Sequence, residues 1–392
     1  MKILQLTSDW KWTGPAAPML ELATAQRAAG HDVVIACAPA SPESEPSLIA
    51  RAREAGFAPV LELERARGVH PLRDRADAAR LRALLARQAF DVVHTWHTRD
   101  HVLALRARAR LPRAARARVV RSYKLAEPIP RWPWNRWLFG PGTDALACVS
   151  EASATANRRL RGGRPVAAIY GAVDLARFAP APADKAVRES LGLAPEHRVI
   201  GIAARAQRHR RFDLLLAALA ALARRDPNAR LVVIGRGTHI EETAVRPAAG
   251  LGIADRVIFA GYRTGDYADV LRCCDVFTFL VPGSDGSCRA LLEAAACAIP
   301  AVTSRRGALP ELVVDGETGI LAEEEPDRLA ASWQALLGDP RAGSGSHSAS
   351  MGSMRRRRSR PTGARRARGR ARPRRAAARG CRPATRARAR AR

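Results

Sequence analysis

The sequence lacks a long apolar run, an ordered cysteine pattern and, in its last part, acidic residues. No stretch reaches about 18 consecutive apolar residues, so a membrane-spanning helix is not expected. The seven cysteines are scattered among mostly apolar or small neighbours, which is typical of reduced, packed thiols and argues against a disulfide framework. The chain begins with a predicted buried strand and not with a signal-peptide pattern, so we expect a cytoplasmic protein.

Acidic residues are absent from residues 342–392, which contain 18 arginines and leave +11 of the net charge of +29 to residues 1–341. This segment has no periodic apolar face, so it cannot bury a core and we predict a low-complexity, disordered basic tail. Dense arginine can tether the chain to an anionic membrane or hold nucleic acid non-specifically. The same composition arises when GC-rich DNA is translated out of frame, and this is the interpretation that we favour.

The rest of the chain alternates short apolar segments with helical patterns. A length of 392 residues suits about two domains, each with its own core. Alternation of this kind predicts parallel sheets with helices on both faces. We therefore predict an α/β fold of two doubly wound, Rossmann-like domains that face each other across a cleft, at residues 1–172 and 173–341, followed by the tail at 342–392.

The stretch at residues 275–311 carries the most distinctive chemistry. An apolar strand at residues 275–281 ends in a Pro-Gly-Ser turn, which leads to Asp285 and Gly286 and then to a helical segment that contains Glu293. Unpaired N–H groups at a helix N-terminus, together with the helix dipole, favour phosphate or sugar oxygens. Asp285 and Glu293 are eight residues apart, near enough to contact one ligand.

This stretch resembles the signature of the retaining glycosyltransferases of family 4, which have the GT-B fold. Their signature is an acidic residue, seven other residues and a glutamate, and the resemblance extends over roughly residues 1–341. The family usually has Glu at the first position, where this chain has the shorter Asp285. The resemblance implies that Asp285 positions the transferred sugar, that Glu293 accepts hydrogen bonds from ribose hydroxyls, and that Gly286 and Leu291 belong to the donor-binding residues.

Other segments match the family's pattern in the expected order. Arg205 and Arg210 match an arginine and a lysine that neutralise the donor's diphosphate, with Arg in place of Lys. Gly235 lies in a Gly-Arg-Gly turn, and Tyr262 in a Gly-Tyr segment that lines the nucleotide base in the family. Gly14 stands where the family has a glycine pair that approaches the sugar's phosphate. A plain turn or a solvated basic loop remains the alternative at each position.

Three histidines, His94, His97 and His101, follow the strand at residues 91–94. No Glu or Cys accompanies them in a recognised metal motif, so no metal site is expected. His97 is a candidate catalytic residue, with a helix-cap role as the alternative. In the family a histidine often follows the next strand and contacts the donor sugar, and here Lys124 takes its place with a fixed positive charge.

Residues 128–139 contain three tryptophans and two arginines among prolines. Both residue types combine an apolar body with a polar or charged tip, which suits a membrane interface. Packing of the tryptophans under a long loop is the alternative.

The resemblance implies transfer of a sugar from a nucleotide-sugar donor to an acceptor hydroxyl with retained anomeric configuration, in cell-envelope glycan or glycolipid synthesis. It implies no cofactor, because the nucleotide sugar is a substrate. A lipid-linked acceptor and peripheral contact with the inner face of the membrane fit the tryptophan segment. Two alternatives remain: a nucleotide-sugar epimerase of related fold, and a non-catalytic protein that binds anionic partners through its tail.

Overall fold

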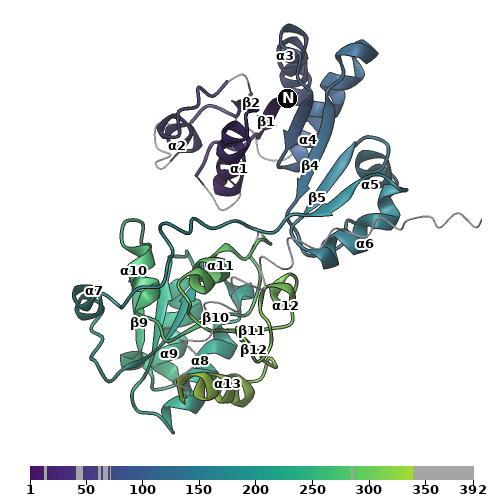
Figure 1. Cartoon of the computed structure of the whole chain (residues 1–392). Helices are drawn as coiled ribbons and strands as arrows, with labels where there is room; N and C mark the ends of the chain where they lie inside the picture. Colours follow the sequence, from purple (N-terminus) through teal and green to yellow (C-terminus); the bar gives the residue numbers. More distant parts are fainter. Residues whose placement is uncertain are drawn as a thin grey trace, which may run out of the picture.

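The computed structural model describes residues 1–12, 16–40, 47–60, 63–64, 69–70, 72–283 and 286–338. These residues form two six-stranded parallel sheets, one from each half of the chain (Figure 1). The predicted doubly wound α/β class is therefore confirmed. The first sheet ends at residue 168 and the second begins at residue 198, while the exact boundary between residues 172 and 173 stays a prediction. The predicted tail at residues 342–392 lies outside the described residues.

The first sheet has the order β2-β1-β3-β4-β5-β6. Its strands are β1 (Lys2–Leu6), β2 (Asp32–Ala36), β3 (Val92–Thr95), β4 (Arg118–Tyr123), β5 (Ala145–Cys148) and β6 (Val166–Ala168). Its helices are α1 (Ala16–Ala28), α2 (Leu48–Glu54), α3 (Arg73–Arg87), α4 (Thr98–Ala109), the 3-10 turn η1 (Arg113–Ala115), α5 (Pro133–Phe139) and α6 (Glu151–Arg161). The strand order reverses between β1 and β3, so a ligand of this sheet is expected beyond the carboxyl ends of those two strands.

The second sheet has the order β12-β11-β10-β7-β8-β9, which places its reversal between β7 and β10. Its strands are β7 (Arg198–Ala203), β8 (Ala229–Ile234), β9 (Val257–Gly261), β10 (Val276–Phe279), β11 (Ala301–Thr303) and β12 (Gly319–Leu321). Its helices and turns are α7 (Lys185–Ser190), η2 (Arg208–Arg210), α8 (Phe212–Ala223), η3 (Glu241–Val245), α9 (Arg246–Gly250), η4 (Ala254–Arg256), α10 (Tyr267–Arg272), α11 (Arg289–Ala296), α12 (Leu309–Leu312) and α13 (Pro326–Gly338).

Strand alternation divides each core into two apolar layers, one on either face of the sheet. In the second sheet Ile200 and Ile202 face the layer beneath α8 and α13, whereas Val199 and Val232 face the layer beneath α10 and α11. The six cysteines in the described residues are buried and form no disulfide with one another, as the sequence predicts. None of the helices in this part of the chain is both long and apolar enough to cross a membrane.

Some short elements give no clear sequence signal. Helix α5 begins with Pro133 at its first position, where proline is pre-organised for a helix, but its seven residues are too few for a clear helical period. Strand β12 has three residues, too few for a strand pattern. Helix α4 begins at Thr98, because the Asp100 side chain accepts the N–H of His97 and caps the first turn.

Candidate functional site

Both predicted diphosphate-binding arginines follow β7, at the carboxyl edge of the second sheet. Arg205 is exposed. Arg210 ends η2 and reaches the loop after β10, where its Nη1 donates a hydrogen bond of 2.7 Å to the Val281 carbonyl. Because β7 and β10 are the neighbours at which the strand order reverses, the two arginines lie where a doubly wound sheet binds its ligand.

The Arg210 guanidinium is half-buried against the second sheet. Its Cζ lies 5.8 Å from the centroid of the Phe279 ring, and its Nε has no hydrogen-bond partner among the described residues. Burial lowers the pKa of Arg210, and the positive charge of Arg205 lowers it further. An arginine in this position still carries its charge at neutral pH, so the pair forms a cationic site with unused donors, which suits a diphosphate.

Two glycines after β8 let the arginine loop lie against the sheet. A Cβ on Gly235 would meet the Ala204 carbonyl oxygen at 2.4 Å, and a Cβ on Gly237 would meet that of Ala206 at 2.3 Å. Gly235 also has φ +137°, a conformation that other residues rarely adopt. Gly235 therefore holds the loop that carries Arg205 in place, while a direct contact with donor stays a prediction.

Tyr262 follows β9 at the same edge. Its side chain is 53% exposed, and the Arg236 guanidinium lies over its ring with 4.9 Å between Cζ and the ring centroid. The N–H of Gly235 donates to the Gly261 carbonyl at 2.7 Å, which ties this strand end to the glycine turn. The ring is thus accessible at the carboxyl edge of the second sheet, while its contact with a nucleotide base stays a prediction.

Glu293 lies on α11 and is buried, with 5% of its surface exposed. Its Oε1 accepts a hydrogen bond of 2.7 Å from Arg289 Nε, and the Tyr267 hydroxyl hydrogen-bonds to the same carboxylate. Burial raises the pKa of Glu293, and Arg289 and Tyr267 oppose that shift. Arg289 also forms an ion pair of 2.9 Å with Glu21 on α1, so this carboxylate belongs to a network that reaches the first half of the chain.

Four further residues were predicted to contact the donor, and the structure describes two of them, Gly286 and Leu291. Gly286 donates its N–H to the Lys124 carbonyl at 2.8 Å, and a Cβ on this glycine would meet that oxygen at 2.3 Å. Gly286 therefore forms one of the contacts between the two halves of the chain. Leu291 is 2% exposed and packs in the apolar layer beneath α11, and its contact with donor stays a prediction. Asp285 and Gly14 lie outside the described residues.

Lys124 follows β4 on the facing side of the site. Its Nζ lies 4.5 Å from the centroid of the Trp96 ring. His94 stacks on the same tryptophan at 4.9 Å between ring centroids, and its Nε2 is 2.8 Å from Ser122 Oγ. Burial, together with the charges of Arg121 and Lys124, lowers the pKa of His94 to about 3. The lysine therefore stands beside a neutral imidazole, opposite Gly286.

His97 is half-buried at the N-terminus of α4. Its N–H donates to Asp100 Oδ2 at 2.8 Å, and Ser8 donates its N–H to Asp100 Oδ1 at 2.6 Å. Asp100 thus joins the loops after β3 and β1, where the strand order of the first sheet reverses. The helix-cap interpretation of His97 is therefore correct for its backbone, and a catalytic role of its ring stays a prediction. His101 is fully buried with its Nε2 2.5 Å from Thr143 Oγ1, so it belongs to the core.

A carboxylate that the sequence did not single out links the two halves. Glu311 on α12 accepts the N–H groups of Glu151 and Ala152, each at 2.8 Å, at the first turn of α6. It also accepts the Tyr170 hydroxyl at 2.6 Å. The glutamate lies about 160 residues from the helix that it caps, so no local pattern could reveal the contact. Asp100, by contrast, occupies the third position of a helix, where capping acids are common.

No group of three or more His, Cys, Asp or Glu side chains that could hold a metal ion occurs in the described ranges. From the second half of the chain, Arg205 and Arg210 bring positive charge to the site and Glu293 brings a carboxylate.

Two family models match the chain in succession. The model described as Glycosyltransferase Family 4 matches residues 13–177, and the one described as Glycosyl transferases group 1 matches residues 197–339. The first match covers strands β2 to β6 of the first sheet, and the second covers the sheet with the two arginines and Glu293.

Curated relatives share about a third of their aligned residues with this chain. A GDP-mannose-dependent alpha-(1-6)-phosphatidylinositol monomannoside mannosyltransferase from Mycolicibacterium smegmatis is 35% identical over 178 residues, which cover 43% of this chain and 46% of the relative. A D-inositol 3-phosphate glycosyltransferase from Actinosynnema mirum is 40% identical over 159 residues, which cover 38% of this chain and 37% of the relative. The chain thus spans less than half the length of these two relatives.

Solved structures resemble the whole arrangement. Anabaena HepE in complex with UDP and glucose has a TM-score of 0.73 at 21% identity, with 91% of this chain and 95% of that one covered. A glycosyltransferase from Rickettsia africae has a TM-score of 0.76 at 15% identity, with 90% and 93% covered. At these identities the likeness shows that the two-sheet arrangement is the same.

Proposed function

This chain belongs to the group 1, or family 4, glycosyltransferases, and from that premise we propose that it transfers a sugar from a nucleotide-sugar donor to an acceptor hydroxyl with retention of anomeric configuration. The observation that carries the proposal is the placement of Arg205 and Arg210 at the strand reversal of the second sheet, beside the loop that leads into the helix of Glu293.

The arginines supply the chemistry that the transfer needs. Negative charge grows on the diphosphate as the bond between the sugar and its phosphate breaks. Two fixed guanidinium groups on rigid loops stabilise that charge without any rearrangement. Arg205 is exposed for direct contact, and Arg210 is oriented by Val281. We propose that the reaction needs no cofactor.

Glu293 is the proposed ribose contact. Its carboxylate is held by Arg289 and Tyr267, so it presents a fixed acceptor to a hydroxyl pair. Asp285 is proposed to position the transferred sugar. Lys124 and His97 are proposed to face the sugar from the first sheet, where the neutral His94 leaves Lys124 as a localised charge.

The acceptor is proposed to be lipid-linked, in envelope glycan or glycolipid synthesis. The name of one relative supports this class, because it acts on a phosphatidylinositol mannoside, whereas another relative acts on an inositol phosphate, which carries no lipid. The same names and the UDP complex of HepE leave both GDP and UDP as donor nucleotides to test. We propose a cytoplasmic protein with peripheral contact at the inner face of the membrane.

A donor panel tests the proposal. The full chain is incubated with UDP- and GDP-sugars, and nucleotide release, sugar products and donor isomers are measured by chromatography and NMR. Hydrolysis or transfer with the donor's anomeric configuration supports the transferase. An isomerised donor supports the epimerase alternative, and absence of both binding and turnover with every donor supports the non-catalytic one.

A further inference from the structure

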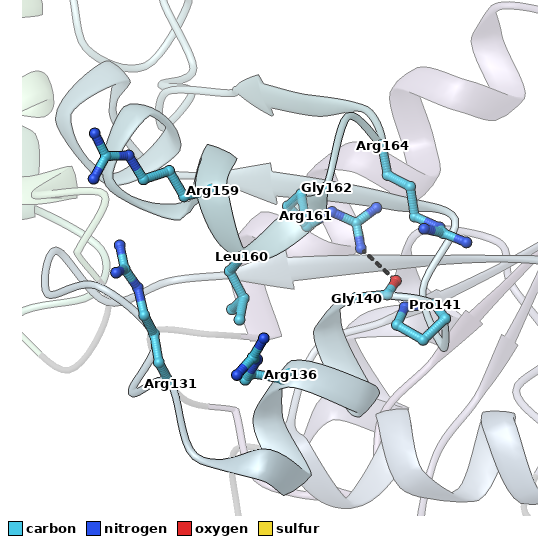
Figure 2. A pocket seen from close by; sticks show the side chains of 9 residues that line it. All are labelled: Arg131, Arg136, Gly140, Pro141, Arg159, Leu160, Arg161, Gly162 and Arg164. Atoms are coloured by element: carbon cyan, nitrogen blue, oxygen red, sulfur yellow. Dashed lines mark hydrogen bonds between the residues drawn. The ribbon is translucent and has the colours of Figure 1, made fainter. Parts of the chain in front are cut away.

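A pocket between α5 and α6, at the edge of the first sheet, is lined by arginines. It has a volume of about 480 Å³ and lies away from the strand reversals that form the candidate site. Its lining residues come from the segment before α5, the two helices and the turns that follow them: Arg131, Arg136, Gly140, Pro141, Arg159, Leu160, Arg161, Gly162 and Arg164. Figure 2 shows Arg131, Arg136 and Arg159 around Leu160, with Arg164 on the far side of Arg161.

The positive charge of this pocket is not neutralised within the described part of the chain. The two carboxylates of the segment at residues 128–166 are already engaged, Asp144 with Arg108 and Glu151 with Arg158. Arg161 is fully buried and donates to backbone carbonyls, including that of Gly140, while its Nε has no partner among the described residues.

Four further guanidinium groups remain at the pocket, and all four are exposed: Arg131, Arg136, Arg159 and Arg164. Like charges gathered without acids repel one another, and an anion with several oxygens relieves that repulsion by accepting bidentate hydrogen bonds. The chemistry of the lining therefore fits a phosphate group.

Beside the pocket, α5 and its N-cap residue expose three tryptophans. Trp132 is 70% exposed, Trp134 is 53% and Trp137 is 50%, whereas Leu138 and Phe139 at the end of the helix are buried. Exposed indoles are costly in water and favourable at the boundary between lipid headgroups and acyl chains. None of the three lines the pocket.

We propose that α5 and the arginine pocket form a docking surface for an anionic phospholipid bilayer, with a headgroup phosphate in the pocket and the three indoles in the headgroup boundary. The arrangement favours a membrane over nucleic acid, because single-stranded nucleic acid is held by aromatic rings that line the basic groove, and these rings lie outside it. The biological role of this surface rests on the proposed function, in which the acceptor is lipid-linked. Binding to vesicles is measured without any sugar transfer.

The test uses the full chain and vesicles of two parts phosphatidylcholine to one part phosphatidylglycerol. Co-sedimentation measures partition, and tryptophan emission with brominated lipids as quencher measures insertion. Residues 339–392 contain no tryptophan, so binding through the tail cannot by itself place an indole in the bilayer. Pure phosphatidylcholine vesicles serve as the uncharged comparison.

Two double variants separate the pocket from general charge. Arg136→Gln with Arg159→Gln is expected to weaken partition roughly fivefold for each arginine removed. Arg224→Gln with Arg225→Gln, at exposed positions that follow α8, removes the same charge and is expected to bind like the parent. Trp132→Ala with Trp134→Ala is expected to lose most of the blue shift and quenching without any change in charge.

Equal weakening by the two arginine pairs, or quenching that the tryptophan pair leaves unchanged, overturns the proposal. A larger loss of single-stranded oligonucleotide binding than of vesicle binding in the pocket variant also overturns it, in favour of a nucleic-acid site. Calorimetry with the donor chosen from the panel is run on each variant in parallel. Normal vesicle docking by a chain that binds no donor would count against the proposed function and leave this surface standing.

Discussion

The two halves of the chain have sheets of equal size but cores of different kinds. Eight Asp, His and Arg side chains are buried in the first half, whereas Glu293 is the one buried Asp, Glu, His, Lys or Arg among the described residues of the second half. The eight are Asp74, Asp77, His94, Arg99, Asp100, His101, Arg121 and Arg161. A charge in the second half is therefore stronger evidence for a ligand site than a charge in the first half.

In the first half, buried charged side chains form hydrogen bonds with backbone groups that lack a backbone partner. Arg161 donates to the carbonyls of Phe139, Gly140 and Thr143, which lie in the turn between α5 and β5. Burial lowers its pKa to about 10, so it remains charged at neutral pH. These groups stabilise loops from within, while the second half keeps an apolar core and places its arginines at the carboxyl edge of the sheet.

The largest expected effect comes from breaking a buried ion cluster of the first half. Arg99 binds Asp74 at 2.8 Å and Asp77 at 2.5 Å, and all three are buried. Arg99→Met leaves both carboxylates without their buried cation, and a break of this kind costs about 3–5 kcal/mol of unfolding free energy. The measurement is urea unfolding followed by circular dichroism.

Arg80→Met is the matched control for that change. Arg80 binds the same Asp77 at 2.9 Å, but its side chain is 46% exposed, so a loss of about 0–1 kcal/mol is expected. Similar losses of unfolding free energy in the two variants would show that burial does not decide how much an ion pair contributes to the stability of this half.

The next prediction concerns the candidate donor site in the second half of the chain. Arg205→Ala and Glu293→Ala are each expected to weaken donor binding by about tenfold or more, since a charge-assisted contact contributes about 1.5–3 kcal/mol. The fold should stay intact, because Arg289 keeps its ion pair with Glu21 when Glu293 is removed. Calorimetry with the donor chosen from the panel measures the affinity.

Arg208→Ala serves as control, because Arg208 lies in the same loop but pairs with Glu242 and is exposed. Unchanged affinity in both site variants, or an equal loss in the control, would refute the assignment of the donor site.

Acid should weaken the first half more than the second. The unfolded chain protonates His94 below about pH 6.5, whereas the folded chain excludes that proton until about pH 3. Stability therefore falls as the pH drops through this window, by at most about 1.4 kcal/mol per pH unit for this group. Burial also lowers the pKa of His101, which adds to the same trend.

His94→Gln should flatten the dependence of unfolding free energy on pH between about 6.5 and 4, because glutamine can still hydrogen-bond to Ser122 but takes up no proton. His209→Gln, at an exposed position in the second half, is the control and should keep the slope of the parent. A slope that survives in the His94 variant would show that another group sets the acid sensitivity.

The fold was predictable because its signals are local. Apolar runs such as residues 199–203 and 230–234 form the strands β7 and β8, as their local pattern indicates. The position of Arg205 and Arg210 was also predictable, since a basic loop directly after a strand must lie at the carboxyl edge of its sheet. Their contact with the donor diphosphate stays a prediction.

What the sequence could not show is which charges become buried and which side chains meet across the cleft. His94 and His101 have polar side chains, yet His94 is buried because it lies on β3 between β1 and β4, and His101 because α4 packs against β3 and β4. Arg289 interrupts a family-like segment and gave no sign of its partner Glu21, which is more than 260 residues earlier. Such pairings follow from tertiary packing alone.

The smallest expected effect tests the link between the halves. Glu311 accepts two N–H groups at the start of α6, and Tyr170 donates a third hydrogen bond to it. Glu311→Gln keeps the size of the side chain but replaces one acceptor oxygen with an NH₂ group, so one N–H loses its partner and the negative charge at the helix N-terminus disappears. Caps and dipole contacts of this kind contribute about 0.5–2 kcal/mol. We expect a larger radius of gyration in small-angle X-ray scattering and little change in the melting of either core, because the contact lies between the sheets and not within them.

Glu317→Gln, at an exposed position a few residues later, is the control and should leave the scattering unchanged. Scattering curves that coincide for both variants and the parent would show that Arg289 and Gly286 hold the halves together without the help of Glu311.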